Sequence, residues 1–219
     1  MPRLLFEKTG NAIWISHLDL MRLFQRSFKR AGLHLKHSQG FSPRPLVAIA
    51  LPLSVGVESK CELLDFDLEG ELVPNDEIME RLNAALVEGV TVRQVYDNGA
   101  KIKHLAYLSC VVSLEYDAGI PQDAANQIQA LFAQEQLIVT KKGKNGTVEQ
   151  DIIPMIKKLE VVEAASNTLE LHALVCCQNP SLNPAQLSAA ITAYLPELTP
   201  DFSKCCRVEI YDSEEKIFR

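Results

Sequence analysis

Apolar and polar residues follow one another in stretches typical of strands and helices. The first half predicts a bent strand over 3–15, a helix over 17–31, strands over 33–38, 46–53 and 57–68, a helix over 75–87 and a strand over 90–95. Ser16 with Asp19 three residues later is typical of a helix start, and Gly32 of a helix end. This half reads β-α-β-β-α-β, the order of a ferredoxin-like sandwich.

The second half repeats that order without detectable sequence identity. It predicts strands over 105–116, 136–141, 168–177 and 205–211, helices over 121–134 and 183–195, and an irregular basic stretch after residue 141. The predicted fold class is therefore α+β, with two tandem ferredoxin-like (βαββαβ) sandwiches that have antiparallel sheets. The predicted domains are 1–98 and 104–219.

Composition is that of an ordinary globular protein, with 219 residues of which 47% are hydrophobic. We expect a cytoplasmic protein that spans no membrane, because the sequence has no apolar run of about 18 residues and no signal-peptide core at its start. The formal charge of -6 conceals a segregation: residues 1–50 carry +6 and residues 51–100 carry −8. A phosphate-bearing partner would therefore use the first fifty residues.

Those fifty residues hold a basic helix face and an irregular loop. Leu18, Met21, Phe24, Phe28 and Ala31 form the predicted buried stripe of the helix. The loop has the sequence SQGFSPRP, from Ser38 to Pro45. The residues predicted to bind nucleic acid are Arg22, Arg26, Lys29, Arg30, Gln39, Gly40, Phe41 and Arg44, with the cations on phosphates and Phe41 on a base. The alternative is a solvated helix face with Phe41 folded under the loop.

Four further residues are candidates for chemistry or support. His17, at the first helical position, is a candidate general base, or else packs locally beside the cap. His37 alternates with Leu33 and Leu35, so we expect it to face the apolar side and bond to Asp19 or Glu58. We expect these two carboxylates to hold Arg44 or His17, and the alternative is an acid–base pair.

The six cysteines lack the spacing of zinc or iron–sulfur ligands, so we expect no metal and no cofactor on this chain. The predicted fold would bring Cys110 near the adjacent pairs Cys176/Cys177 and Cys205/Cys206. Two interpretations remain open: a packed core of reduced thiols or a metal site.

Three motifs together resemble one family. They are SHLDLMR from Ser16, the SQGFSPRP loop and LPLSVGVES from Leu51, with weaker similarity in KKGK from Lys141 and DIIP from Asp151. The sequence is similar to the radical SAM-linked family of unknown function, whose members lie at the C-terminus of cobalamin-binding radical SAM proteins or are encoded beside them.

The resemblance implies a non-catalytic accessory module for a radical enzyme that acts on RNA or on another macromolecule. This chain has no cluster-binding cysteine triad, so the radical SAM protein would be a partner supplied in trans. Two other functions remain open. One is a metal-independent endoribonuclease similar to the CRISPR repeat-processing proteins, although residues 196–206 lack the glycine-rich loop of that class. The other is a protein-binding adaptor that uses the acidic region 58–80.

Overall fold

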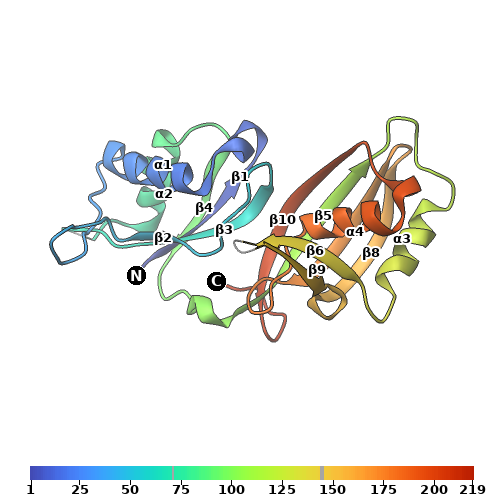
Figure 1. The fold of residues 1–219 in the computed structure, drawn as a ribbon. Coiled ribbons are helices and arrows are strands. Elements are labelled where there is room, and N and C mark those ends of the chain that lie inside the picture. Colours follow the sequence, from blue (N-terminus) through green and yellow to red (C-terminus); the bar gives the residue numbers. More distant parts are fainter. Residues whose placement is uncertain (71, 144–145) are drawn as a thin grey trace. The chain divides into compact units, whose positions relative to one another are not determined.

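A computed structural model describes residues 1–70, 72–143 and 146–219. The chain divides into two compact units, Met1–Ile102 together with Arg219, and Lys103–Phe218 (Figure 1). Both units mix helices with antiparallel strand pairs, so the structure has the predicted α+β class. Within the described ranges, no helix is long and apolar enough to cross a membrane.

The first unit is a four-stranded sheet with two helices. Its elements are β1 (Arg3–Lys8), α1 (His17–Arg30), β2 (Val47–Ile49), β3 (Glu58–Phe66), α2 (Asn75–Ala85) and β4 (Val90–Tyr96). The strands lie in the order β4-β1-β3-β2, and each neighbouring pair is antiparallel. Arg3 on β1 stands directly opposite Asp65 on β3, and this register fixes which side chains face the helices.

Aromatic pairs join α1 to the sheet. The rings of Phe6 and Phe24 meet edge to face with centroids 4.8 Å apart, and those of Phe28 and Phe66 are 5.1 Å apart. The buried face of α1 consists of Leu20, Phe24, Ser27 and Phe28. The prediction that Leu18 belongs to this stripe is wrong: its side chain is 66% exposed. At about 100° per residue, Leu18 points away from Leu20.

Two predicted strands of the first unit are not continuous strands. β1 ends at Lys8, and Gly10–Trp14 forms a 3-10 helix. The buried Lys8 ammonium donates to the carbonyls of Ile13 and Ile15, at 3.0 and 2.8 Å, and so holds the chain in this turn. Residues 33–38 make only isolated bridges, Leu35 with Leu68 and His37 with Pro45.

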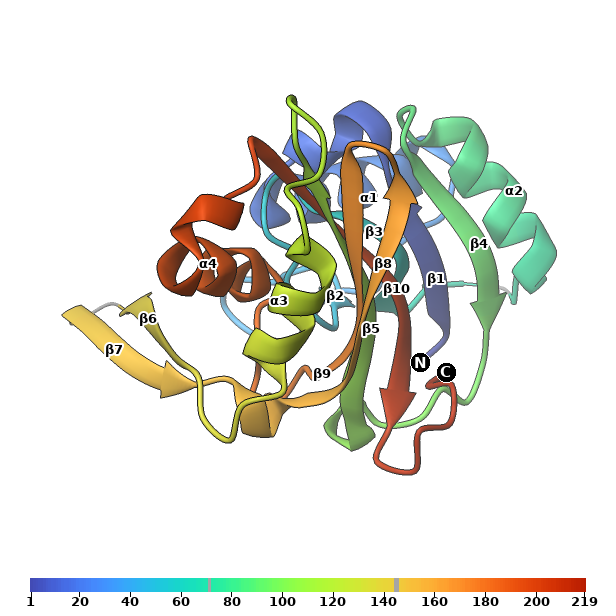
Figure 2. The same ribbon diagram turned by 90° about the vertical axis from the view of Figure 1, so that its right-hand side faces the viewer.

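The second unit is also a four-stranded sheet with two helices on one face (Figure 2). Its sheet and helices are β5 (Leu105–Glu115), α3 (Ala124–Phe132), β8 (Ile156–Ala165), β9 (Thr168–Cys176), α4 (Ala185–Tyr194) and β10 (Phe202–Asp212). The strand order is β10-β5-β9-β8, again with antiparallel neighbours. Its first strand therefore lies between its third and fourth, as in the first unit.

A separate hairpin of β6 (Ile138–Gly143) and β7 (Gly146–Asp151) replaces the strand predicted over 136–141. The corresponding sheet strand is β8, which falls in the stretch that the sequence suggested was irregular. β8 is an edge strand with exposed Lys157, Lys158 and Glu160, so it lacks a clear apolar alternation. Of the KKGK motif, Lys144 lies outside the described residues.

Candidate nucleic-acid interface

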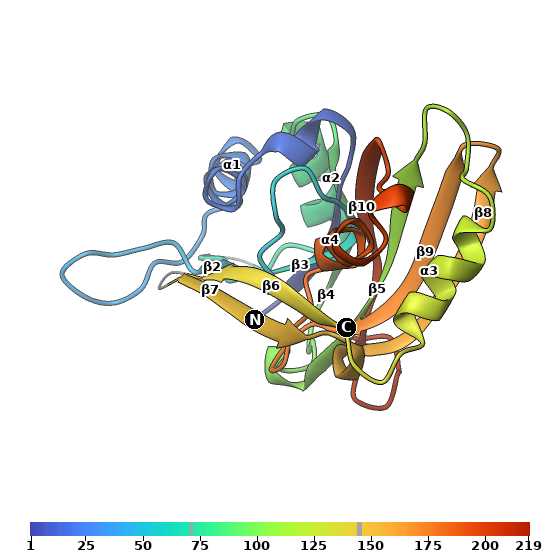
Figure 3. The same ribbon diagram turned by 45° about the vertical axis from the view of Figure 1, so that its right-hand side comes forward.

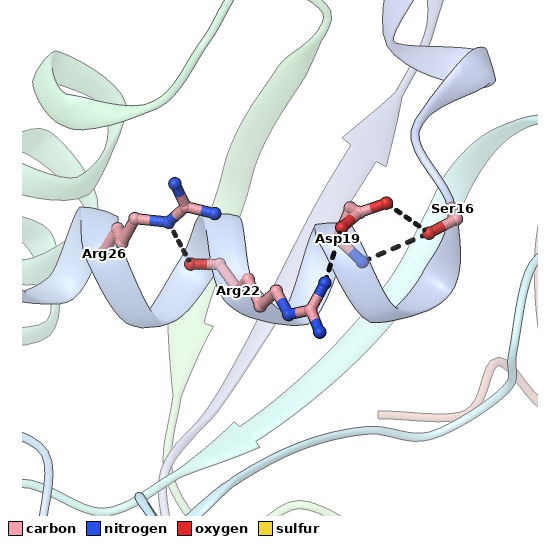
Figure 4. Close-up of polar contacts among 4 residues, drawn as sticks. All are labelled: Ser16, Asp19, Arg22 and Arg26. Carbon is pink, nitrogen blue, oxygen red and sulfur yellow. Dashed lines mark hydrogen bonds and ion pairs between the residues drawn. The ribbon is translucent and has the colours of Figure 1, made fainter.

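The N-terminus of α1 is capped by Ser16 and followed by a chain of polar contacts (Figure 4). The Ser16 hydroxyl accepts the Asp19 N–H at 3.2 Å and donates to Asp19 Oδ2 at 2.7 Å. Asp19 Oδ1 pairs with Arg22 at 3.0 Å. The pKa of Asp19 lies below its usual range, mainly because of the hydrogen bond with the Ser16 hydroxyl and secondly because of the bond with Arg22. Asp19 thus fixes the helix start and takes up the charge of Arg22.

Fewer cations are available on this surface than the sequence suggests. Arg30 donates to the Ala85 carbonyl at 2.7 Å, and Arg26 Nε donates to the Arg22 carbonyl at 3.3 Å. Among the residues that the structure describes, Arg26, Lys29 and Arg44 make no ion pair.

Burial and ion pairs inside the first unit also reduce the part of the +6 charge of residues 1–50 that reaches the surface. Arg3 is buried and forms two hydrogen bonds with Asp65, at 2.6 and 3.1 Å. Lys8 is fully buried, and Lys36 pairs with Asp67 at 3.2 Å. Counting charges along the sequence therefore overstates the charge that this surface presents to a polyanion.

The SQGFSPRP loop is held closed at its base and open at its tip. The Ser38 N–H donates to the Arg44 carbonyl at 2.8 Å, and the Arg44 N–H donates to the Ser38 hydroxyl at 3.0 Å. Phe41 is 108% exposed, which excludes the alternative of an aromatic ring folded under the loop. Gly40 has φ +140°, which side-chain-bearing residues rarely adopt. The connection between α1 and β2 extends away from the rest of its unit (Figure 3).

A pocket of about 330 Å³ lies between α1 and the base of this loop. Phe28, Leu33, Leu35 and Pro45 supply its apolar lining, and Gln25, Lys29, His34, His37 and Glu69 its polar lining. The pocket brings together Lys29 of the predicted basic helix face and Pro45 at the end of the SQGFSPRP loop. The sequence carried no signal for it, because Glu69 joins from a segment far along the chain.

The predicted supporting residues lie elsewhere than expected. His37 is exposed, because the chain leaves the unit there to enter the loop, and it lines the pocket beside His34. Glu58 accepts the Gly10 N–H at 3.3 Å. Within the described chain, neither Asp19 nor Glu58 hydrogen-bonds to His17, His37 or Arg44. His17 is half-buried, and its Nδ1 has no hydrogen-bond partner among those residues.

The cysteines of the second unit do not converge as a group of three or more potential ligands among the described residues. β5 lies between β9 and β10, so Cys110 is opposite Ala173 and Arg207 and not opposite another cysteine. Burial raises the pKa of Cys177 to about 12 and that of Cys205 to about 12. No group of three or more potential ligands converges anywhere in residues 1–70, 72–143 and 146–219.

Comparison with known families gives a match over most of the chain. The profile described as "Uncharacterized protein conserved in bacteria (DUF2344)" matches residues 2–184, most of both units. This chain belongs to the DUF2344 family. No curated protein matches it.

A solved structure with a TM-score above 0.5 resembles this DUF2344 chain in fold. A chain of the crystal structure of a Cbf5-Nop10-Gar1 complex matches 95% of it with a TM-score of 0.52 at 9% identity. This chain spans 48% of that one, and the likeness concerns the fold alone. The crystal structure of an unknown protein from Galdieria sulphuraria matches 94% of this chain and 97% of its own, at 10% identity and a TM-score of 0.27.

Proposed function

We propose that this protein binds RNA through the SQGFSPRP loop and the adjoining face of α1. The observation that carries the proposal is the full exposure of Phe41 at the loop tip. Burying a phenylalanine side chain is worth about 1.5–3 kcal/mol, so a ring kept in water on a loop is better explained by binding than by stability. An unpaired base stacked on such a ring contributes about 1–3 kcal/mol.

The neighbouring cations fit contacts to phosphates. Arg26, Lys29 and Arg44 have no acidic partner among the described residues, and all three side chains are exposed. Neutralising about three phosphates gives a slope of log affinity against log salt of roughly −2 with the single-strand coefficient. Arg22 and Arg30 contribute less, because Asp19 and the Ala85 carbonyl already engage them.

A salt series with single-stranded RNA tests the proposal. Fluorescence anisotropy should show binding at about 50 mM salt that weakens with the slope given above. Phe41→Ala should weaken binding by about 1–3 kcal/mol without changing the slope, because stacking releases no counterions. Arg26→Glu with Lys29→Glu should weaken binding and flatten the slope.

Two controls make the test specific. Val148→Ala removes another exposed hydrophobic side chain, 60% exposed in the β6–β7 hairpin, and should leave RNA affinity unchanged. Lys103→Glu reverses an exposed charge in the second unit and should affect binding less than Lys29→Glu alone. Absence of RNA binding at about 50 mM salt would favour the protein-adaptor function instead.

The RNA-binding module would serve a radical SAM enzyme supplied in trans. This part of the proposal rests on the resemblance of the SHLDLMR, SQGFSPRP and LPLSVGVES motifs to the radical SAM-linked family. When the native protein is purified from its host, a radical SAM polypeptide should co-purify with it. Recovery of RNA without such a polypeptide would support RNA binding and contradict the partnership with a radical SAM enzyme.

The proposal includes the fold. In both units the strand order places the first strand between the third and the fourth, with antiparallel neighbours throughout. This order supports two ferredoxin-like sandwiches in tandem, the second with a hairpin inserted before its second strand. An experimental structure of each unit tests this topology.

A further inference from the structure

The pocket beside the loop has the lining of a small-molecule site. Phe28, Leu33 and Leu35 are buried and form its apolar part, while polar groups from α1 and the following segment complete it. Its volume of about 330 Å³ is near the lower end of the usual range of about 300–1,000 Å³. A pocket of this size suits one nucleotide better than a dinucleotide.

Two opposite charges line the same pocket without neutralising each other. Lys29 comes from α1, and Glu69 follows β3 and donates its backbone N–H to the His34 carbonyl at 2.8 Å. Within the part of the chain that the structure describes, neither charge makes an ion pair, with the other or with a third group. The ammonium and the carboxylate are therefore both available to a ligand.

We infer that this pocket holds one unpaired guanine of the bound RNA. The inference rests on the proposed RNA binding and names the base that this surface reads. Guanine carries two adjacent donors, N1–H and the 2-amino group, which match the two oxygens of the Glu69 carboxylate. It also carries two adjacent acceptors, O6 and N7, which are the groups that lysine contacts on this base.

The other bases match these two charges less well. Adenine and cytosine each offer one exocyclic amino group to a carboxylate, and uracil offers a single ring N–H. Pro45, which is half-buried, and the edge of Leu35 offer an apolar contact to the flat face of any base, so the charged residues Lys29 and Glu69 provide the discrimination. Phe41 lies four residues beyond His37 and is free to stack on a neighbouring base.

Uridine-rich 12-nucleotide RNAs that carry one central guanine, inosine or adenine test the inference by fluorescence anisotropy. Inosine differs from guanosine only by the missing 2-amino group. The guanine RNA should bind about tenfold more tightly than the inosine RNA, which is the usual effect of one hydrogen bond to a charged group. Glu69→Gln should remove this preference, whereas Glu80→Gln, at an exposed position on α2, should keep it.

The outcomes separate the inference from the proposed function. Equal affinity for guanine and inosine RNA, or a preference that survives Glu69→Gln, overturns the guanine pocket and leaves the RNA-binding proposal standing. Failure to bind any of the RNAs at about 50 mM salt overturns both. Circular dichroism of Glu69→Gln, an isosteric change at an exposed residue, should match that of the unmodified protein.

Discussion

The guanidinium of Arg30 donates a hydrogen bond of 2.7 Å to the backbone carbonyl of Ala85, the last residue of α2. The same nitrogen also donates to the Ser27 hydroxyl at 3.0 Å. The last carbonyls of a helix have no partner within the helix, and cations are stabilising at this end. Arg30 therefore joins the ends of α1 and α2, although its position in the sequence places it on the basic face.

Arg30→Met should lower the free energy of unfolding by about 1–2 kcal/mol, because it removes a charge-assisted hydrogen bond at a helix C-terminus. Urea denaturation measures the loss. Arg26→Met is the matched control, because among the described residues Arg26 hydrogen-bonds to the Arg22 carbonyl of its own helix, so its removal should cost less. Equal stability of the Arg30 variant and the unmodified protein would show that the Ala85 contact contributes nothing.

Apolar periodicity predicted the long elements of both units and failed where tertiary contacts decide. The bounds of α1, α2, β3 and β4 agree with the pattern to within two residues. β8 was missed because an edge strand alternates weakly. The 3-10 helix Gly10–Trp14 was missed because buried Lys8, a residue type normally exposed, organises that turn through two carbonyls.

The composition of the candidate site was partly predictable. The loop and the helix face follow from local sequence, since the glycine and prolines exclude regular structure and the cations recur at helical spacing. The pocket could not be predicted, because it requires the position of Glu69 relative to Lys29. Which cations form ion pairs was also beyond the sequence, because Asp65 and Asp67 meet Arg3 and Lys36 only through contacts between segments far apart along the chain.

Acid should weaken the start of α1 through Asp19. Its folded pKa is depressed by Ser16 and then Arg22, so its stabilising effect is complete above the unfolded value of about 3.9 and is lost as the pH falls through the folded value. Asp19→Asn should therefore lower the urea midpoint at pH 6 and change it less at pH 3. A difference that grows on acidification would contradict this assignment.

Ser16→Ala removes the cap of α1 and should lower the free energy of unfolding by about 1 kcal/mol at pH 6.

Removing one partner of the Arg3–Asp65 pair should be costly. The Arg3 side chain is 5% exposed and that of Asp65 is 25% exposed. Asp65→Leu should lower the free energy of unfolding by about 3 kcal/mol, because it leaves a buried guanidinium without its carboxylate. The double variant Arg3→Met with Asp65→Leu should recover much of that loss. Chemical denaturation of both variants provides the test, and a double variant less stable than the single one would refute it.

Two thiols of the second unit, the half-buried Cys177 and the buried Cys205, should react slowly. With pKa values of about 12 at Cys177 and at Cys205, the reactive thiolate is scarce at pH 8. Iodoacetamide should label both residues at least about a hundredfold more slowly in the native protein than in denaturant, as measured by mass spectrometry of peptides. Rapid native labelling of either residue would contradict its raised pKa.

Gly89 should tolerate no side chain, because two backbone segments meet there. The Thr9 N–H donates to the Gly89 carbonyl at 2.8 Å, and a Cβ on Gly89 would lie 2.4 Å from the Thr9 carbonyl oxygen. Its φ of +84° adds backbone strain. Gly89→Ala should therefore lower the free energy of unfolding by about 3 kcal/mol or more, in the range of overpacked sites.

The variant Gly32→Ala separates the two contributions expected at Gly89, the steric clash of the new Cβ and the backbone strain. Gly32 also has a positive φ, +70°, but nothing lies within 4 Å of the position its Cβ would take. Its substitution should cost only the backbone penalty of about 1–2 kcal/mol. Thermal or urea denaturation of the two variants side by side should show the larger loss at Gly89. Equal losses of stability in the two variants would mean that the Thr9 segment moves aside. The close approach between the start of the 3-10 helix and the start of β4 would then not constrain the fold.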